Sequence, residues 1–241
     1  MAYTTIDDPS AYFNSLIYTG NVTVRALTFD GNSDLAVDWI WLKSRSISGN
    51  HHLYDSVRGT QKHLRSNLDS AEGTNGGTDG VTAFSSNGVT IGTNTASNDD
   101  GETFVGWGWK AGTSFTNDAS GTGIGTIDSS GSVNTDAGFS IISFTGTETS
   151  SQSVAHGLGA VPELIISKSR DVADNWMVHH GSFSENDYIS LNLTNAKASA
   201  SSVWSSLPTS TVINIGDNAG VNDDGAMIMY AFRSVQGYSK F

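Results

Sequence analysis

The chain has 241 residues, of which 12 are basic and 24 acidic, so its formal net charge is −12 at pH 7. Nucleic-acid binding requires clustered cations that neutralise phosphates, and this charge therefore excludes nucleic acid as an expected partner. The absence of cysteine excludes disulfides and thiolate metal sites. No run of about 18 apolar residues occurs, so we expect no membrane insertion.

The amino-terminal segment, residues 1–12, precedes the first strand pattern and has no counterpart later in the chain. It predicts an arm that becomes ordered on contact with a partner. Tyr3, Asp7, Asp8 and Tyr12 are its candidate contact residues. The alternative is a terminus that is disordered or packed on its own domain.

A sequence repeat divides the remainder of the chain. Residues 38–45 (DWIWLKSR) correspond to residues 163–170 (ELIISKSR), and the NDDG segment at 98–101 recurs at 222–225. A repeat of this length corresponds to a whole domain, since solenoid repeats are shorter. We therefore predict one domain at 13–112 and a similar one at 138–241, both derived from an internal duplication.

The local patterns within each repeat are those of β-strands. Residues 105–109 alternate large side chains with glycine, and residues 228–232 repeat this period of two. We expect the aromatic side chains in the domain interiors and another backbone segment close to Gly106 and Gly108. Residues 39–42 are apolar on both faces, which predicts a central strand. The fold class is therefore all-β, with two tandem, similar β-sandwich or jelly-roll domains.

The segment between the repeats, residues 113–137, is dominated by Gly, Ser and Thr. This composition predicts a linker with room for one bridging strand. The glycine-rich run at 121–125 is not followed by a helix pattern, so it does not predict a nucleotide-binding loop.

The two NDDG segments offer carboxylates that calcium could use. Asp99, Asp100, Asp223 and Asp224 provide hard oxygen ligands. Their order departs from the alternating pattern of an EF-hand loop, and Asp-Gly before a strand is typical of a hairpin turn. A turn is the favoured interpretation, and calcium binding is the alternative.

Two pairs of adjacent histidines are candidates for metal binding, but their spacing does not favour it. His51 and His52 precede Asp55, and His179 and His180 stand in the second repeat. Neighbouring residues on a strand point to opposite faces, so an adjacent pair cannot share one metal ion. Histidines at a sheet surface or edge are the favoured interpretation, and we predict no metal centre and no cofactor.

Catalytic and glycan-binding patterns are also weak. Asp38 and Glu163 occupy equivalent repeat positions, so the duplication explains them without catalysis, and we predict no enzyme. Trp41, Trp176 and Trp204 are candidates for stacking on a glycan. Tryptophan in an alternating strand is more often part of a core.

Six segments of the chain resemble an uncharacterised repeat domain of virion structural proteins from tailed bacteriophages, especially marine phages. The segments span residues 38–45, 50–59, 104–112, 138–141, 154–159 and 237–241. The resemblance covers nearly all of the chain. It implies a component of a phage particle, tail-fibre-like or head-decorating, with no known activity.

A functional expectation follows from the resemblance and the short length. We expect an accessory protein on the virion surface, with capsid decoration favoured over a tail or fibre subunit, that docks through its termini. Its partners would be major capsid or tail proteins and further copies of itself, in a homo-oligomer such as the trimers typical of fibres. A host-glycan-binding adhesin is the alternative function, and a glycan-degrading enzyme is a more remote one.

Overall fold

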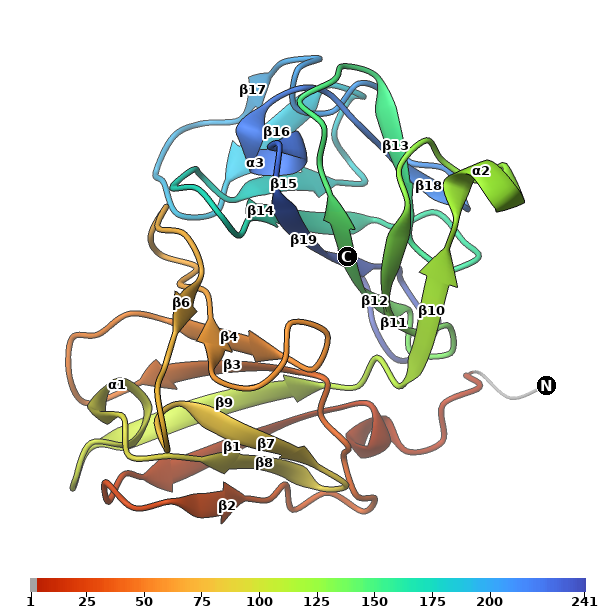
Figure 1. Ribbon diagram of the computed structural model, residues 1–241. Coiled ribbons are helices and arrows are strands. Elements are labelled where there is room, and N and C mark those ends of the chain that lie inside the picture. Colours follow the sequence, from red (N-terminus) through yellow and green to blue (C-terminus); the bar gives the residue numbers. More distant parts are fainter. Residues whose placement is uncertain (1–3) are drawn as a thin grey trace. The chain divides into compact units, whose positions relative to one another are not determined.

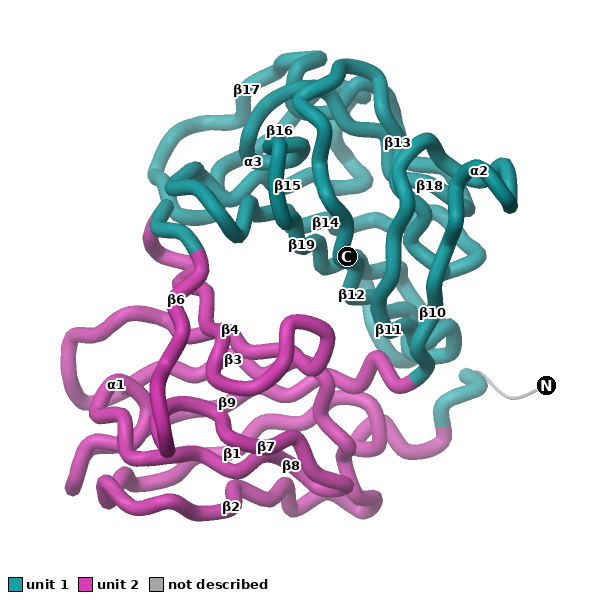
Figure 2. The backbone as a smooth tube through the Cα atoms, in the orientation of Figure 1, with its two compact units in different colours: residues 1–6, 69–71, 113–241 teal, residues 7–68, 72–112 magenta. Residues whose placement is uncertain are grey.

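The computed structural model describes residues 4–241 and is all-β, as expected from the strand patterns (Figure 1). Tyr3 of the predicted arm lies outside the described residues. The chain forms two compact units (Figure 2): unit 1 comprises residues 1–6, 69–71 and 113–241, and unit 2 comprises residues 7–68 and 72–112. Within the described range, no helix is both long and apolar enough to cross a membrane.

Unit 2 contains a four-stranded and a three-stranded antiparallel sheet. The larger sheet has the order β1-β9-β3-β4, and the smaller has the order β2-β8-β7. The strands are β1 (Phe13–Thr19), β2 (Arg25–Leu27), β3 (Trp39–Ser44), β4 (His52–Asp55), β7 (Val81–Ser85), β8 (Gly88–Ile91) and β9 (Thr103–Trp109). A short hairpin pairs β5 (Lys62–His63) with β6 (Gly73–Thr74), and the helical turns are η1 (Pro9–Ala11) and α1 (Thr95–Asn98).

The core of unit 2 lies between these two sheets. Ile40, Leu42 and Phe104 from the larger sheet share one buried cluster with Val89 and Ile91 from the smaller. Apolar residues that alternate along strands of both sheets meet in this way in a sandwich. The predicted central strand is confirmed, because β3 lies between β9 and β4.

The alternation in β9 has the opposite orientation to the one expected. Gly106 and Gly108 face the core, where a Cβ added to Gly108 would lie 2.7 Å from Phe29 Cζ. The prediction of a neighbouring backbone segment was therefore wrong, because bulky side chains from β1, from β3 and from the segment between β2 and β3 occupy this space. Trp107 and Trp109 lie on the other face of the sheet and are only half-buried.

Unit 1 contains an eight-stranded sheet of order β10-β11-β12-β19-β14-β15-β16-β17 and a two-stranded sheet of β13 and β18. The strands are β10 (Thr113–Asn117), β11 (Ser129–Asn134), β12 (Phe139–Thr145), β13 (Gln152–Ala155), β14 (Leu164–Ser169), β15 (Met177–His180), β16 (Asp187–Ser190), β17 (Ala198–Ser199), β18 (Val212–Ile215) and β19 (Ala226–Phe232). Two short helices are α2 (Ala119–Thr122) and α3 (Ala219–Asn222). Phe144, Met229 and Ile165 from the large sheet pack with Val154 and Ile213 from the small one.

The central strands of the two units follow the same order. The order β1-β9-β3-β4 in unit 2 corresponds to β12-β19-β14-β15 in unit 1. The registers also agree, since Phe13 pairs with Trp109 in unit 2 and the equivalent Phe139 pairs with Phe232 in unit 1.

The segment predicted as a linker is part of unit 1. Residues 113–137 contain β10, α2 and β11, which extend the large sheet beyond β12. The prediction of a linker with room for one bridging strand was therefore wrong. Its cause is the composition of β10 and β11, in which solvent-facing Ser and Thr leave few apolar residues, such as Phe115 and Val133, to mark a strand. Val133 joins the core, and Phe115 packs against it.

The predicted amino-terminal arm is folded onto unit 2 from Asp7 onward. Asp8 caps η1 and accepts a hydrogen bond from Ser33 Oγ at 2.6 Å. The Ser10 hydroxyl also donates to Asp8 and, with Ser33, holds the pKa of this carboxyl below its usual value. The Tyr12 carbonyl accepts from the backbone N–H of Lys110. The alternative of a self-packed terminus therefore describes Asp7, Asp8 and Tyr12 better than a free arm.

Candidate functional site

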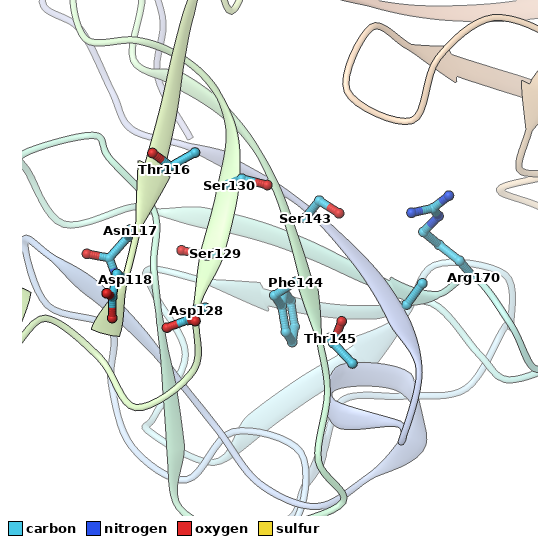
Figure 3. Close-up of a pocket in the computed structure, with 11 residues that line it drawn as sticks. Thr116, Asn117, Asp118, Asp128, Ser129, Ser130, Ser143, Phe144, Thr145 and Arg170 are labelled. Carbon is cyan, nitrogen blue, oxygen red and sulfur yellow. The ribbon is translucent and has the colours of Figure 1, made fainter. Parts of the chain in front are cut away.

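The candidate site is an open groove of about 510 Å³ on unit 1, beside the first strands of its large sheet (Figure 3). The strands β10, β11 and β12, with Asp118 after β10 and Asp128 before β11, supply most of its lining, and Arg170 after β14 and Ala226 of β19 complete it. The lining residues are Thr116, Asn117, Asp118, Asp128, Ser129, Ser130, Ser143, Phe144, Thr145, Arg170 and Ala226.

A row of hydroxyl groups forms the middle of the groove. Thr116 pairs with Ser130 across β10 and β11, and Ser130 pairs with Ser143 across β11 and β12. Directly paired residues share one face of a sheet, and Phe144, the neighbour of Ser143, belongs to the core on the opposite face. The three hydroxyls therefore lie side by side on the face directed away from the core.

Two carboxylates at one end of the groove support a short helix. Asp118 Oδ1 accepts from the backbone N–H of Gly121 and from Ser120 Oγ, and Asp128 Oδ1 accepts from the N–H of Ala119. The Ser120 hydroxyl, followed by the Gly121 N–H, lowers the pKa of Asp118. A general acid needs a raised pKa, so Asp118 is poorly suited to protonate a leaving group.

Arg170 lies at the end of the groove opposite Asp118 and Asp128 (Figure 3). The groove thus has a cationic end, a row of neutral hydroxyls and an acidic end. Groups of this kind can exchange hydrogen bonds with a polyhydroxylated ligand such as a glycan. Sequence reasoning missed this site, because strand register brings its hydroxyls together and no local motif records that register.

The tryptophans expected to stack on a glycan lie elsewhere. Trp176 and Trp204 are 0% and 2% exposed and belong to the interior of unit 1, so a stacking role for them was wrong. Both are retained inside because a buried indole contributes a large apolar area. Trp41 in unit 2 is half-buried, and its Nε1 donates to His51 Nδ1 at 2.8 Å. Its ring lies edge-on to that of Trp107, with the centroids 6.4 Å apart.

The calcium candidates lie where short helices end. Asp99 and Asp223 are the C-cap residues of α1 and α3, and Asp100 and Asp224 are exposed. Asp223 Oδ2 accepts from Ser169 Oγ at 3.2 Å. Across residues 4–241, no group of three or more His, Asp or Glu side chains is arranged to hold a metal ion.

The histidines are distributed over separate environments. His52 and His63 are both buried in unit 2, with their ring centroids 5.2 Å apart. Burial lowers the pKa of each to about 4, and the nearby Arg65 charge contributes. The pKa of His51 is also lowered, by partial burial and then by Lys43. The sequence analysis did not identify His63 as a neighbour of His52. The two rings meet because His63 lies in β5, which packs beside β4.

A buried ion pair occupies the same part of unit 2. Arg58 Nε lies 2.5 Å from Asp55 Oδ2, and Arg58 Nη1 lies 3.1 Å from Glu72 Oε2. Arg58 Nη2 also donates to the Leu53 carbonyl. The Asp55 carboxylate is therefore engaged with Arg58.

The fold and groove define an all-β protein of two sandwich-like units, one of which carries a polar, hydroxyl-lined site. The chain belongs to the family described as domain of unknown function (DUF7483), whose profile matches residues 8–241. The match includes both units and the strands β10 and β11. No curated protein and no solved structure matches the chain.

Proposed function

We propose that this chain is a non-enzymatic structural component of a tailed-bacteriophage particle, displayed on the particle surface as a capsid-decorating or fibre-like subunit. The resemblance of six segments to a virion repeat domain supports the proposal. The observation that carries it is the use of the buried polar side chains, which hold backbone segments in place within each unit.

Equivalent carboxylates in the two units illustrate this use. Asp38 Oδ2 accepts from the backbone N–H of Ala111 at 2.9 Å, and Glu163 Oε2 accepts from that of Ser234 at 2.8 Å. Each acid secures the segment that leaves the last strand of its four-stranded core, β9 or β19. The acids that a glycosidase would use as a pair are therefore engaged as structural anchors.

A buried lysine serves the same purpose. Lys168 is fully buried, and its Nζ donates to the carbonyls of Ser169 and Val172 at 2.8 and 3.0 Å. Burial lowers its pKa to about 8. Lys43, its counterpart in unit 2, donates to the carbonyl of Ser44. We infer from such paired anchors, and from the common strand order, that the two units derive from one duplicated sequence.

The carboxyl-terminal end of unit 1 is the candidate contact with the particle. Phe241 lines a pocket of about 480 Å³ together with Val161 and Leu207, which are 50% and 49% exposed. Exposed apolar side chains that lie together, as these do around one pocket, form the kind of surface that contacts another protein. We expected docking through both termini. The carboxyl-terminal contact is kept in this proposal, whereas residues 7–12 at the amino terminus pack in unit 2 and are not proposed as a contact.

The location of the protein provides the direct test. Tailed phages whose genomes encode this chain are purified on a density gradient, and the particles are examined by mass spectrometry and by gold-labelled antibody in electron microscopy. The proposal expects the chain at regular positions on intact particles. Its presence in infected lysates but absence from purified particles would contradict the proposal.

The contact with the particle can be tested on a phage that lacks the gene. Purified Leu207→Glu is added to the deficient particles, and its occupancy is compared with that of the unaltered chain. Val24→Glu is the matched control, because Val24 is also 49% exposed but lies in unit 2. We expect Leu207→Glu to lose binding to the particles and Val24→Glu to retain it. Equal binding of both variants would contradict a particle contact at this pocket.

A second candidate function, binding of a host glycan, is favoured by the groove on unit 1. Its hydroxyls, amide, carboxylates and Arg170 provide the donors and acceptors that sugar hydroxyls use. A glycan array probed with the unaltered chain and with Ser143→Arg tests this function. Binding that Ser143→Arg removes, but that the exposed-site control Ser201→Arg preserves, would support an adhesin.

A further inference from the structure

Strand β10 is the outermost strand at one end of the large sheet of unit 1, as Figure 1 shows. An edge strand exposes backbone N–H and C=O groups that can pair with another chain. Natural edges are usually protected by charged side chains, proline, bulges or short length. Strand β10 has none of these: it is a regular five-residue strand, TSFTN, without a charged residue.

The hydrogen-bond pattern identifies the outward-facing backbone groups of β10. Gly146 N donates to Gly225 O and Arg233 N to Gly138 O, so the even-numbered residues of β12 bond to β19. Successive residues in antiparallel sheets alternate their bonding side. Following the registers through β11, the odd-numbered residues of β10 bond to β11. The N–H and C=O groups of Ser114 and Thr116 therefore point away from the sheet.

Nothing within the described part of the chain bonds to these outward groups of Ser114 and Thr116, and both residues are exposed. The corresponding edge in unit 2 is different. There the Asn14 side chain accepts from the outward N–H of Ser15, and the Arg25 guanidinium donates to the outward carbonyl of Thr19. Side chains thus cap two of the outward backbone groups of β1, whereas those of Ser114 and Thr116 in β10 are uncapped.

The residues of β10 are also complementary to a second copy of themselves. We propose that two copies of the chain associate through β10, antiparallel about a twofold axis, with Phe115 opposite Phe115. Ser114 of each copy then faces Thr116 of the other, in pairs that exchange two hydrogen bonds each. This register joins outward-facing groups on both sides, and the two cores remain on the same face of the combined sheet.

The apolar residues on the core-facing side of β10 also favour a second copy of the chain as the partner. Phe115 borders a pocket of about 250 Å³ that is also lined by Ile124, Ala155 and Gly157, and Ile124 is 38% exposed. In the proposed register the two Phe115 residues form a non-hydrogen-bonded pair, with their Cα atoms about 4.5 Å apart. Each ring then lies beside the open apolar pocket of the other copy.

Charge is compatible with pairing at this edge although each chain carries −12. Residues 113–117 are uncharged, so the paired strands bring no like charges together. The first acid after the strand, Asp118, faces Gly112 of the other copy. The Lys110 side chain runs beside Gly112, with its Cε 3.6 Å from the position of an added Cβ. An acid and a base therefore approach each other twice across the twofold axis.

The association is tested first on the full chain. Light scattering after gel filtration and sedimentation equilibrium, over a wide range of protein concentration, should show a monomer that converts to a dimer. A chain that remains monomeric throughout would overturn the proposal and would leave the edge to an extended segment of another protein.

A charge exchange then locates the interface. The double variant Ser114→Lys/Thr116→Lys places like charges opposite each other across the axis, and we expect loss of the dimer. The variant Ser114→Lys/Thr116→Glu places opposite charges in the same pairs, and we expect the dimer to return. Thr194→Lys/Ser201→Lys, at exposed positions of unit 1, is the matched control. Dimers unaffected by the first variant would overturn the proposal.

Disulfide formation tests the register, because the chain has no natural cysteine. A mixture of Ser114→Cys and Thr116→Cys should oxidise mainly to the mixed dimer, since these positions face each other only between copies. Each variant alone should give much less crosslinked product. Preferential self-crosslinking of either variant would contradict the register. Circular dichroism of every variant confirms that the fold is retained.

Discussion

Asn98 and Asn222 fix loops in their respective units through the same three hydrogen bonds. The fully buried Asn98 donates from Nδ2 to the carbonyls of Gly92 and Thr23, at 2.7 and 2.9 Å. Its Oδ1 accepts from the backbone N–H of Asn21 at 3.1 Å. One side chain thereby joins the end of α1 to two other segments of unit 2.

The bonds of Asn222 match these in unit 1. Its Nδ2 donates to the carbonyls of Gly216 and Thr149, and its Oδ1 accepts from the N–H of Thr147, each at 2.8 Å. A primary amide supplies two donors and an acceptor, which neither a carboxylate nor an aliphatic side chain can provide. The asparagine of each NDDG segment is therefore its main structural residue.

We expect Asn98→Leu to destabilise the protein by about 3 kcal/mol, because it leaves buried backbone groups without partners. The free energy of unfolding is measured by urea denaturation, and Asn222→Leu should show a similar loss. The control is Asn195→Leu at an exposed position. If Asn98→Leu and Asn195→Leu had equal effects, the anchoring role would be refuted.

The buried pair His52 and His63 should make stability depend on mildly acidic pH. Burial lowers the pKa of both to about 4, below the usual 6.5. The unfolded chain therefore binds more protons between pH 6.5 and 4, and stability falls as the pH falls through this range. We expect a loss on the order of a few kcal/mol, measured as the urea midpoint at a series of pH values.

The double variant His52→Phe/His63→Phe provides the comparison, because phenylalanine retains a ring but does not titrate. We expect a smaller decrease in stability between pH 6.5 and 4 than in the unaltered chain. Some decrease should persist, since burial also lowers the pKa of His156 and His179. An unchanged pH profile would show that His52 and His63 do not contribute.

The parts of the fold that could be predicted have a strong apolar pattern: residues 39–42 are apolar on both faces, and residues 105–109 alternate large side chains with glycine. Residues 39–42 and 105–109 lie within β3 and β9, as their patterns predict. Residues 113–137 could not be recognised as strands, because β10 and β11 are half solvent-facing and contain Ser, Thr and Gly. Their place in the sheet depends on pairing with β12, and that pairing leaves little local signal.

The candidate site was less predictable than the fold. The hydroxyls of Thr116, Ser130 and Ser143 are distant in sequence and become neighbours through the registers of three strands. The tryptophan candidates failed for a related reason, since an apolar ring has the same sequence signal in a core as in a binding site. Only the three-dimensional packing assigns Trp176 and Trp204 to the interior.

Calcium should have little effect on stability. Asp99 and Asp223 cap short helices, and Asp223 is engaged by Ser169, so the carboxylates are not arranged around a common centre. We expect the melting temperature to be the same in excess calcium and in excess chelator, as measured by differential scanning calorimetry. A rise in calcium that Asp99→Asn or Asp223→Asn removes would establish a site in these turns.

Gly108 of β9 should be intolerant of even one added methyl group. A Cβ at Gly108 would lie 2.7 Å from Phe29 Cζ and 3.0 Å from Val37 Cγ2, both in the core of unit 2. We expect Gly108→Ala to destabilise the protein by about 1 to 3 kcal/mol through overpacking. At Gly49 an added Cβ meets no atom within 4 Å. Gly49→Ala should therefore be neutral or slightly stabilising, since alanine restricts the unfolded chain. Urea denaturation compares the two variants, and equal midpoints would contradict the placement of Gly108 against the core.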